Sequence, residues 1–587
     1  MPKKACKYLV FYIGLVCFLR VSGQNPVLNE QFTLKLFNTD SVKVFKYLKY
    51  KDKYKTKKEL IKSVNIILDD LRFQGYLLAD IDKVKGDSLN KIYYLRIGKK
   101  FKWAILKKGN ADMDILSHLG YSEKLYTNKP FSYSQTARLI DKTITAYENN
   151  GYPFVSLKLD SISVNDNTLS AVLNITKNKL IQIDSIVVKG DAKINKTFLY
   201  RYLGLKPMML YDEASFMAIS KKIKQLPFLT ETKGQEIRLT EKQNKMYLFL
   251  GKKNCSQFDG IIGILPDDKT KKTIFTGDVK IKLVNSIFRA GETVDLNWRR
   301  LQALTQDFNA RVIYPYILGS PIGVDYNLKI YKKDSSFIDV NNNVGLQYYF
   351  SGLNNLKVFY KQRTADLLST SGLAFITTLP DYADISTSSY GLGLTFEKLD
   401  YRFNPHKGFA INISGQTGNK TIKKNSKIND IVYNNLQLKS TQYQSEGNVN
   451  LFLQIKGNSV IRMAAQYATV FGTAPVFKNE LFRIGGLRTL RGFDEESIYA
   501  SSYVIPTLEY RFLFGQNSNI LLFAEGAWYE NNSSTIYLKD MPYSIGAGIN
   551  FDTKAGIFSL NYALGSQKGN AIDVRSGKIH FGLTALF

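Results

Sequence analysis

Between Cys255 and Phe587 the sequence alternates apolar residues with small or polar ones, and this period of two limits what the second half of the chain can form. Residues 344–350 place Val, Leu, Tyr and Phe at every second position, and residues 545–551 place Ile, Ala, Ile and Phe in the same way. Successive side chains of a strand point to opposite faces. Each such segment is therefore predicted to be a strand with one apolar and one polar face.

A strand with an apolar outer face and a polar inner face is typical of a transmembrane β-barrel that encloses a hydrated lumen. After the first 23 residues the sequence has no apolar run of about 18 residues, so helical membrane spans are excluded. At roughly 10 residues per membrane strand, with a similar allowance for turns, residues 255–587 predict about 16 antiparallel strands. Phe581 and Phe587 lie on one face of the last of these strands, and we expect them to form its C-terminal strand signal.

Residues 1–23 are predicted to be a signal peptide. Lys3, Lys4 and Lys7 precede an apolar run at 8–19, and small residues close the segment at Gly23. A run of about 12 apolar residues is shorter than a membrane span needs. Export, together with the aromatic last strand, favours a membrane barrel over the alternatives of a soluble β-sandwich or propeller.

The chain carries a formal charge of +30, which falls to +26 when Lys3, Lys4, Lys7 and Arg20 leave with the signal peptide. A basic protein of this kind invites comparison with nucleic-acid-binding proteins. The lysines are scattered, however, and export separates the protein from nucleic acid. We therefore predict no nucleic-acid partner and interpret the charge as a solvated surface or as contact with anionic lipid.

Residues 28–252 have a different pattern, in which helical and strand segments alternate. Breaks at Gly75, Gly151 and Pro227 are spaced 76 residues apart, which indicates a tandem repeat. In the first repeat Thr56 and Glu59 form a predicted capping box. The helix that follows has a single apolar face, made by Leu60, Val64, Ile67, Leu68 and Leu71.

Three small α+β modules are predicted from these breaks, at residues 28–98, 99–178 and 180–252. Each is expected to contain an opening strand, two helices and two closing strands. The second opens at Lys102–Gly109 and the third at Ile181–Gly190. One larger α+β domain is the alternative. Edge strands of such modules could pair with an extended guest chain.

The segment Phe482–Phe493, FRIGGLRTLRGF, places a Gly485-Gly486 turn and the tripeptide Arg491-Gly492-Phe493 within the predicted barrel. Together with the repeats and the strands, this segment resembles the BamA and TamA family of outer-membrane assembly factors. That family has periplasmic POTRA domains and a C-terminal bacterial surface antigen barrel. Three other segments also resemble family motifs, namely Asn404–Phe409, Glu509–Phe512 and Phe523–Gly526.

The resemblance implies that Arg491 lies at the tip of a loop folded into the lumen. Its acidic partners would be on the strands that follow the loop, which points to Glu509, Glu525 or both. Glu525 stands where the family usually has Asp. A guanidinium withdrawn from water requires charge-assisted bonds, so we expect Arg491 to lock the loop in place.

The resemblance also implies a function. The protein is expected to lie in the bacterial outer membrane with its modules in the periplasm, and to insert or translocate unfolded client proteins through a weakly closed barrel seam. Outer-membrane or secreted clients, membrane lipid and accessory periplasmic or lipoprotein subunits are the expected partners. The alternatives are a two-partner-type secretion pore for one dedicated client, and a passive porin or receptor barrel.

An enzymatic function is not predicted. The three histidines, His118, His406 and His580, are far apart in the sequence, and the chain has neither a Gly-x-Ser-x-Gly elbow nor a His-Glu-x-x-His pair. We expect no catalytic residues, no metal site and no cofactor.

Overall fold

The computed structural model describes residues 32–38, 50–87, 89–266, 273–302, 305–370, 373, 376, 378–402, 404–434, 436–553 and 556–586. The predicted signal peptide and Phe587 lie outside the described residues. Two compact units make up the chain: residues 1–181 with 210–213, and residues 182–209 with 214–587. None of the helices described is both long and apolar enough to cross a membrane.

The first module is a four-stranded sheet, in the order β2-β1-β4-β3, with one described helix. Its elements are β1 (Phe32–Asn38), β2 (Lys53–Tyr54), α2 (Lys57–Phe73), β3 (Asp80–Gly86) and β4 (Asn90–Arg96). The hydroxyl of Thr56 accepts the amide N–H of Glu59 at 3.2 Å and so begins α2. The Glu59 carboxylate accepts the amide of Lys55 instead of that of Thr56, so only half of the predicted capping box forms. The five predicted apolar residues of α2 are buried.

Strand β3 begins later than the sequence indicates. A strand is predicted from Tyr76 to Ile81, but β3 starts at Asp80. Gly75 has a φ of 100°, and the amide of Tyr76 bonds back to the carbonyl of Leu71 at 3.0 Å. Residues 76–79 therefore form a turn after α2, because Gly75 in the left-handed conformation reverses the chain there.

The second module repeats this arrangement, with sheet order β6-β5-β8-β7. Its elements are β5 (Lys102–Lys107), α3 (Met113–His118), η2 (Glu123–Tyr126), β6 (Lys129–Pro130), α4 (Tyr133–Glu148), β7 (Ser156–Asn165) and β8 (Thr168–Thr176). Trp103 and Tyr147 are buried in its core. Ser132 caps α4 by accepting the amide of Gln135.

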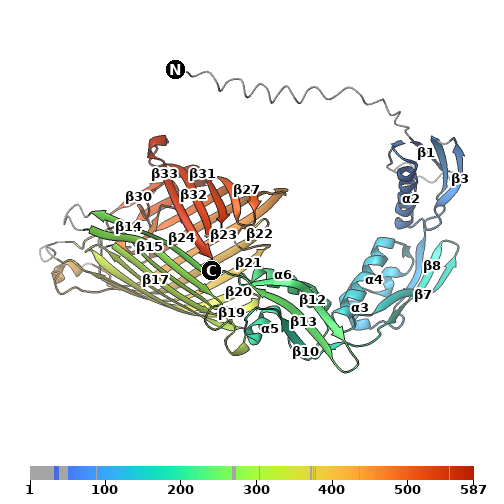
Figure 1. Cartoon of the computed structure of the whole chain (residues 1–587), viewed down its shortest axis with the longest axis horizontal. Helices are drawn as coiled ribbons and strands as arrows, with labels where there is room; N and C mark the ends of the chain where they lie inside the picture. Colours follow the sequence, from blue (N-terminus) through green and yellow to red (C-terminus); the bar gives the residue numbers. More distant parts are fainter. Residues whose placement is uncertain are drawn as a thin grey trace, which may run out of the picture. The chain divides into compact units, whose positions relative to one another are not determined.

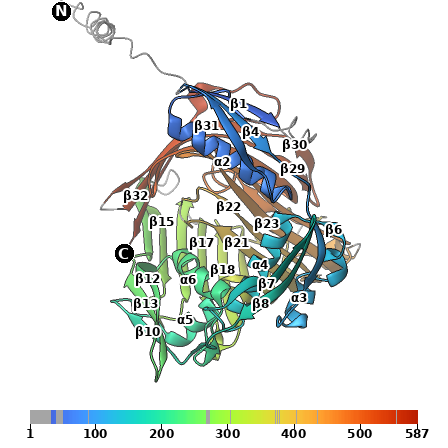
Figure 2. The same cartoon turned by 90° about the vertical axis from the view of Figure 1, so that its right-hand side faces the viewer.

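The third module belongs to the second unit together with the barrel, apart from residues 180, 181 and 210–213. It contains β9 (Gln182–Ile183), β10 (Ser185–Lys189), α5 (Lys196–Leu203), β11 (Met209–Leu210), α6 (Glu213–Gln225), β12 (Leu229–Leu239) and β13 (Asn244–Lys252). The strands β10, β13 and β12 form one sheet, and Figure 2 shows them side by side. The single strand predicted at Ile181–Gly190 is divided at Asp184, because the Asp184 carboxylate accepts the amide of Asn244 at 2.7 Å.

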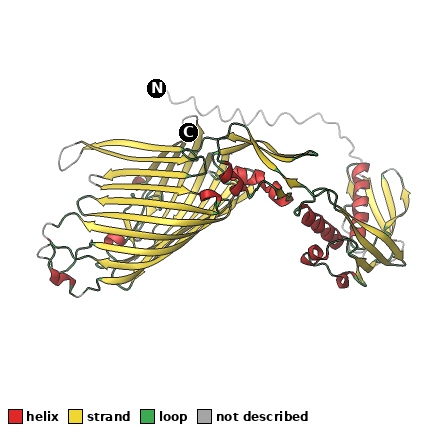
Figure 3. Cartoon of the chain, turned by 90° about the horizontal axis from the view of Figure 1, so that it is seen from below, coloured by secondary structure: helices red, strands yellow, loops and turns green. Residues whose placement is uncertain are grey.

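Residues 257–586 form a closed antiparallel barrel of 16 described wall strands, which confirms the predicted fold (Figures 1 and 3). Two wall strands are interrupted, so β28 with β29 and β30 with β31 each occupy one position. The elements are β14 (Gln257–Pro266), β15 (Thr273–Val284), β16 (Thr293–Gln302), β17 (Thr305–Tyr314), β18 (Ile322–Lys333), β19 (Phe337–Ser351), β20 (Asn354–Leu367), β21 (Ile385–Leu399), β22 (Gly408–Ile422), β23 (Lys439–Lys456), β24 (Ser459–Gly472), β27 (Ser502–Gly515), β28 (Ser518–Gly526), β29 (Trp528–Asn532), β30 (Tyr537–Asp540), β31 (Tyr543–Thr553), β32 (Gly556–Ser566) and β33 (Lys578–Leu586).

The two faces of the wall differ as the alternation predicts. On β19, Leu346 and Tyr348 are more than half exposed on the outside, whereas Gln347 between them is 5% exposed on the inside. Asp325 of β18 is fully buried on the inner face and binds Arg311 at 2.7 Å. An apolar exterior and a charged, hydrogen-bonded interior are what a wall between lipid and a lumen requires.

A loop and its latch inside the barrel

Residues 473–501, here called the lumen loop, connect β24 to β27. The loop contains the short helix η6 (Lys478–Glu480) and a hairpin of β25 (Phe482–Ile484) and β26 (Ile498–Ala500). The predicted motif residues 485–493 form the tip of this hairpin. Strand β14 begins at one end of the barrel, here called the module end, and the lumen loop starts from the opposite end.

Arg491, at the tip, is bound to the wall by two carboxylates. Its main-chain amide donates to Glu525 Oε2 at 2.8 Å, and its Nε donates to Glu525 Oε1 at 2.7 Å. Its Nη2 also reaches Glu509 Oε2 at 3.2 Å. The guanidinium carbon lies 3.4 Å from the centroid of the Phe523 ring. The structure thus brings Arg491 together with both acidic residues singled out from the sequence, and we call these three residues the arginine latch.

The latch is closed to solvent. The side chains of Arg491, Glu509 and Glu525 are 9%, 2% and 4% exposed. Glu509 and Glu525 come from the neighbouring strands β27 and β28, on which both face inward. In such a site a bidentate, charge-assisted contact is strong, and removing one partner leaves an uncompensated buried charge.

Glu509 is shared among three arginines. Arg511 Nε donates to Glu509 Oε1, and Arg462 Nη1 lies 3.4 Å from Glu509 Oε2. Arg462 is in turn fixed by two bonds to Asn450 Oδ1, at 3.0 and 2.8 Å. Arg511 belongs to the segment Glu509–Phe512 that resembles a family motif, but it was not predicted to bind Glu509, and Arg462 was not predicted at all. The position of Arg511, two residues after Glu509 on the same strand face, is a signal that could have identified it.

Glycine is required where the tip meets β32. Gly492 has a φ of 88°, and a Cβ atom there would lie 2.9 Å from the amide nitrogen of Gly565. A Cβ on Gly565 would in turn lie 2.6 Å from the Gly492 carbonyl oxygen and 2.9 Å from the Phe493 ring. The Arg-Gly-Phe tripeptide therefore fits against the wall only because both positions have no side chain. Gly565 was not predicted from the sequence.

A second buried ion pair holds the start of the loop. Lys420 Nζ of β22 lies 2.5 Å from Glu480 Oε2 and 2.7 Å from the carbonyl of Pro475. The other oxygen of Glu480 accepts from Gln442 of β23 at 2.6 Å. The side chains of Lys420 and Glu480 are 1% and 0% exposed. The loop is consequently fixed to the wall at its start as well as at its tip.

The barrel is closed by a short seam between its first and last strands. In the described residues β14 and β33 pair only through Gln257 with Leu586 and Phe258 with Ala585. By contrast, β21 and β22 pair along their whole length. Over most of their length β14 and β33 are thus not joined by main-chain hydrogen bonds. This seam is the least tightly paired part of the described wall.

The loop contacts the wall on both sides of this seam. On the first side, Arg488 lies 3.4 Å from Asp278 of β15, and Glu496 accepts from Arg299 of β16. On the other side, Asp494 lies 2.7 Å from Lys578 Nζ of β33. The tip therefore crosses behind the seam and is bound to strands that flank it.

No group of three or more His, Cys, Asp or Glu residues within the described ranges could hold a metal ion. Cys255, immediately before β14, is a buried free thiol. Burial raises the pKa of this thiol to about 11. A thiol of that pKa is mostly protonated at neutral pH and is a poor nucleophile.

Several known proteins are similar to this chain. The Omp85 superfamily domain matches residues 287–587, and no curated protein matches the chain. The solved structure of CdiB from Acinetobacter baumannii superposes with a TM-score of 0.52 at 11% identity, over 90% of this chain and 97% of that one. CdiB from Escherichia coli gives 0.51 at 12% identity, with the same coverage of both chains. BamA from Haemophilus ducreyi lacking POTRA domains 1–3 gives 0.42 at 14% identity, over 84% of this chain and all of that one.

At these identities the two CdiB structures show a common fold and nothing more. The domain match is more informative, because it covers just over half of the chain and contains the lumen loop and the latch. It confirms the family relationship predicted from the Arg-Gly-Phe motif. This chain therefore belongs to the Omp85 superfamily and is an outer-membrane β-barrel protein whose N-terminal modules lie in the periplasm.

Proposed function

We propose that this protein inserts client proteins into the outer membrane, or moves them across it, by opening the seam between β14 and β33. Membership of the Omp85 superfamily supports an insertion or translocation role in general. The observation that carries the specific proposal is the lumen loop bound across a seam that only two residue pairs close. No bond chemistry is involved.

The seam is suited to a client strand. An open β14 or β33 edge would expose unpaired amide and carbonyl groups to lipid. Each unsatisfied group there costs a free energy of several kcal/mol. A client strand that pairs with the edge satisfies those groups by β-augmentation. Opening is therefore favoured when a client is present and disfavoured when it is absent.

The arginine latch would control this opening. While Arg491 is bound to Glu509 and Glu525, the tip stays where Arg488 and Asp494 bind strands on the two sides of the seam. Separating the flanking strands requires the loop to leave one side. The latch therefore sets how readily the seam opens, and it positions the loop without contacting the client.

The periplasmic modules would receive the client at sheet edges. In the second module β7 is an edge strand, and its Ile162 and Val164 are 58% and 57% exposed. An extended apolar client segment could add to this edge and cover both side chains. Accessory periplasmic or lipoprotein subunits are proposed as further partners, as predicted for the family.

A reversible crosslink across the seam tests the proposal. Phe258 and Ala585 are directly paired, so cysteines at both positions can form a disulfide in a Cys255→Ser background. We expect oxidation to block client assembly in proteoliposomes and reduction to restore it. The matched control places cysteines at Val358 and Leu392, a directly paired and outward-facing pair within the firmly closed wall, where oxidation should change nothing. Full activity with the seam crosslinked would refute lateral opening.

Export of a single dedicated client through the lumen is the second candidate function. It is supported by an inner-wall cavity of about 270 Å³ lined mainly by polar side chains, among them Asn327, Asn343, Gln347 and Gln466. Depleting the protein and surveying the outer-membrane proteome separates the candidates. Broad loss of barrel proteins indicates general assembly, loss of one secreted protein indicates dedicated export, and altered solute uptake alone indicates a passive channel.

A further inference from the structure

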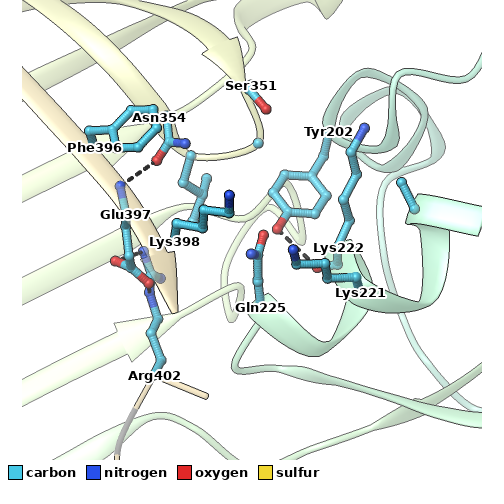
Figure 4. Close-up of a pocket in the computed structure, with 13 residues that line it drawn as sticks. Tyr202, Lys221, Lys222, Gln225, Ser351, Asn354, Phe396, Glu397, Lys398 and Arg402 are labelled. Carbon is cyan, nitrogen blue, oxygen red and sulfur yellow. Dashed lines mark hydrogen bonds and ion pairs between the residues drawn. The ribbon is translucent and has the colours of Figure 1, made fainter. Parts of the chain in front are cut away.

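A cavity of about 290 Å³ lies within the second unit, between the third module and the module end of the barrel wall (Figure 4). Helices α5 and α6 supply one side through Tyr202, Lys221 and Lys222. Strand β21 supplies the other side through Phe396 and Lys398. Neither the latch nor the seam includes any of these residues.

The barrel side of the cavity lies at the level of an aromatic girdle. The Phe396 ring stacks with Phe350 at 6.2 Å and with Phe409 at 5.6 Å between centroids. Phe396 is on the lipid-facing side of β21, because Leu392, four residues earlier on the same face, is 67% exposed. Lys398 is two residues closer to the periplasm on that face. Aromatic belts mark the membrane interface, so the cavity lies at the depth of the lipid headgroups.

The cavity has a surplus of positive charge. Arg402 is neutralised by two bonds to Glu397, at 2.8 and 3.1 Å. Lys222 Nζ donates to the carbonyl of Leu203 at 2.7 Å.

The surplus comes from two other lysines. In the described part of the chain Lys221 and Lys398 have no ion-pair partner, and Figure 4 shows them extending toward the cavity from opposite sides. An anion between these two ammonium groups would complete the site.

We propose that this cavity binds the phosphate headgroup of an anionic phospholipid from the periplasmic leaflet. Lys221 and Lys398 would contact the phosphate from the module and from the barrel, while the acyl chains lie against Phe396 and Phe350. A basic site next to the membrane attracts anionic lipid electrostatically. A bound lipid would thereby connect α6 to β21 and hold the third module at the barrel rim. This inference is independent of which client the protein handles.

Lipid binding by the full-length protein tests the site. The protein, purified in a neutral detergent, is titrated with acyl-labelled phosphatidylglycerol, and binding is followed by fluorescence anisotropy. We expect the Lys221→Gln/Lys398→Gln variant to bind roughly 10- to 30-fold more weakly, since each lysine near an anionic surface contributes on that order. The Lys221→Arg/Lys398→Arg variant should retain binding. Labelled phosphatidylcholine should bind weakly to all variants.

The matched control is Lys224→Gln/Lys456→Gln, which removes two exposed lysines, one on α6 and one at the module end of β23, outside the cavity. This control should bind phosphatidylglycerol like the wild type. An equal loss in the control would show a diffuse charge effect and overturn the site. Inorganic phosphate at millimolar concentration is then compared with unlabelled lipid as a competitor. If the two compete equally well, the ligand is a soluble anion and the lipid assignment is overturned. Wild-type mobility of unheated samples on a gel confirms that each variant is folded.

Discussion

The carboxylate of Glu525 accepts hydrogen bonds from both the main-chain amide and the guanidinium of Arg491. Glu509, by contrast, accepts from Arg491 only through a longer bond of 3.2 Å and is shared with two other arginines. The two acidic residues therefore differ in how they hold the loop. Glu525 fixes the backbone of the tip, whereas Glu509 links the tip to a charge cluster on the wall.

Glu525→Gln is accordingly expected to release the loop more than Glu509→Gln does. Glu525→Gln removes the charge that opposes Arg491 in a buried site, at a cost of roughly 3–5 kcal/mol. Limited proteolysis of residues 473–501 in proteoliposomes measures the effect. Arg491→Ala serves as the reference for a fully released tip. Loop protection in Arg491→Ala that equals wild type would contradict the latch.

Lys420 and Glu480 form a second, independent test of loop anchoring. Lys420→Met leaves Glu480 charged and buried, and we expect a loss of about 3–5 kcal/mol. The double variant Lys420→Met/Glu480→Gln should recover much of this loss, because no unpaired charge remains. The temperature at which the folded gel band disappears gives both effects. If the losses of stability in Lys420→Met and in Glu480→Gln simply add in the double variant, the two residues are not coupled.

Gly492→Ala should displace the tip from β32. The added Cβ would lie 2.9 Å from the Gly565 backbone nitrogen. The alanine would also have to adopt a φ of 88°, which residues with a side chain rarely do. Gly569→Ala separates these causes, since Gly569 has a φ of 72° but no atom within 4 Å of the added carbon. Loop protease protection should fall in Gly492→Ala and stay unchanged in Gly569→Ala. Equal loss in both variants would mean that backbone strain, and not the close approach, explains the glycine.

The second module should lose stability in acid through Asp112. The Lys177 ammonium, 2.8 Å away, and then the Tyr147 hydroxyl lower the pKa of Asp112 below its ordinary value. A lowered folded pKa means that the contribution is present above about pH 4, the unfolded value, and is lost as pH falls through the folded pKa. The contribution is small because both side chains are more than a third exposed.

Hydrogen exchange in residues 99–178 between about pH 5 and pH 3 measures this effect. Asp112→Asn should remove the part of the acid dependence that the wild type shows in α3 and its neighbours. The control is Asp141→Asn, which changes an exposed carboxylate of α4 in the same module. An unchanged acid profile in Asp112→Asn would exclude this ion pair as the cause.

Local patterns predicted local structure well. The apolar face of α2, from Leu60 to Leu71, is buried as its periodicity requires, and the alternation on β19 gives the correct outer and inner faces. Element boundaries were less accurate. The start of β3 moved to Asp80 because the turn after Gly75 uses backbone bonds that the apolar pattern does not reveal.

Long-range pairs could be predicted only where a resemblance supplied them. Arg491 and its acidic partners were found through a motif, although periodicity alone gave no reason to connect them. Lys420 and Glu480 are 60 residues apart, and nothing in the sequence around either residue indicates the other. Whether such residues meet depends on how the loop enters the lumen, which is decided by the closed barrel and not by either segment.

The loop contacts on both sides of the seam link two equilibria that would otherwise be separate, namely release of the loop and opening of the seam. In the proposed mechanism a flanking strand cannot move away while the tip is held, so the population of open barrels is limited by the population of released loops. Each free-energy difference of about 1.4 kcal/mol changes an equilibrium constant tenfold. If release of the loop costs about 4 kcal/mol, roughly one barrel in a thousand is therefore open without a client. A client that stabilises the open edge by a similar amount would raise that population to near one half. The membrane would thus remain sealed at rest by thermodynamics alone, with no need for a separate gate or an energy source.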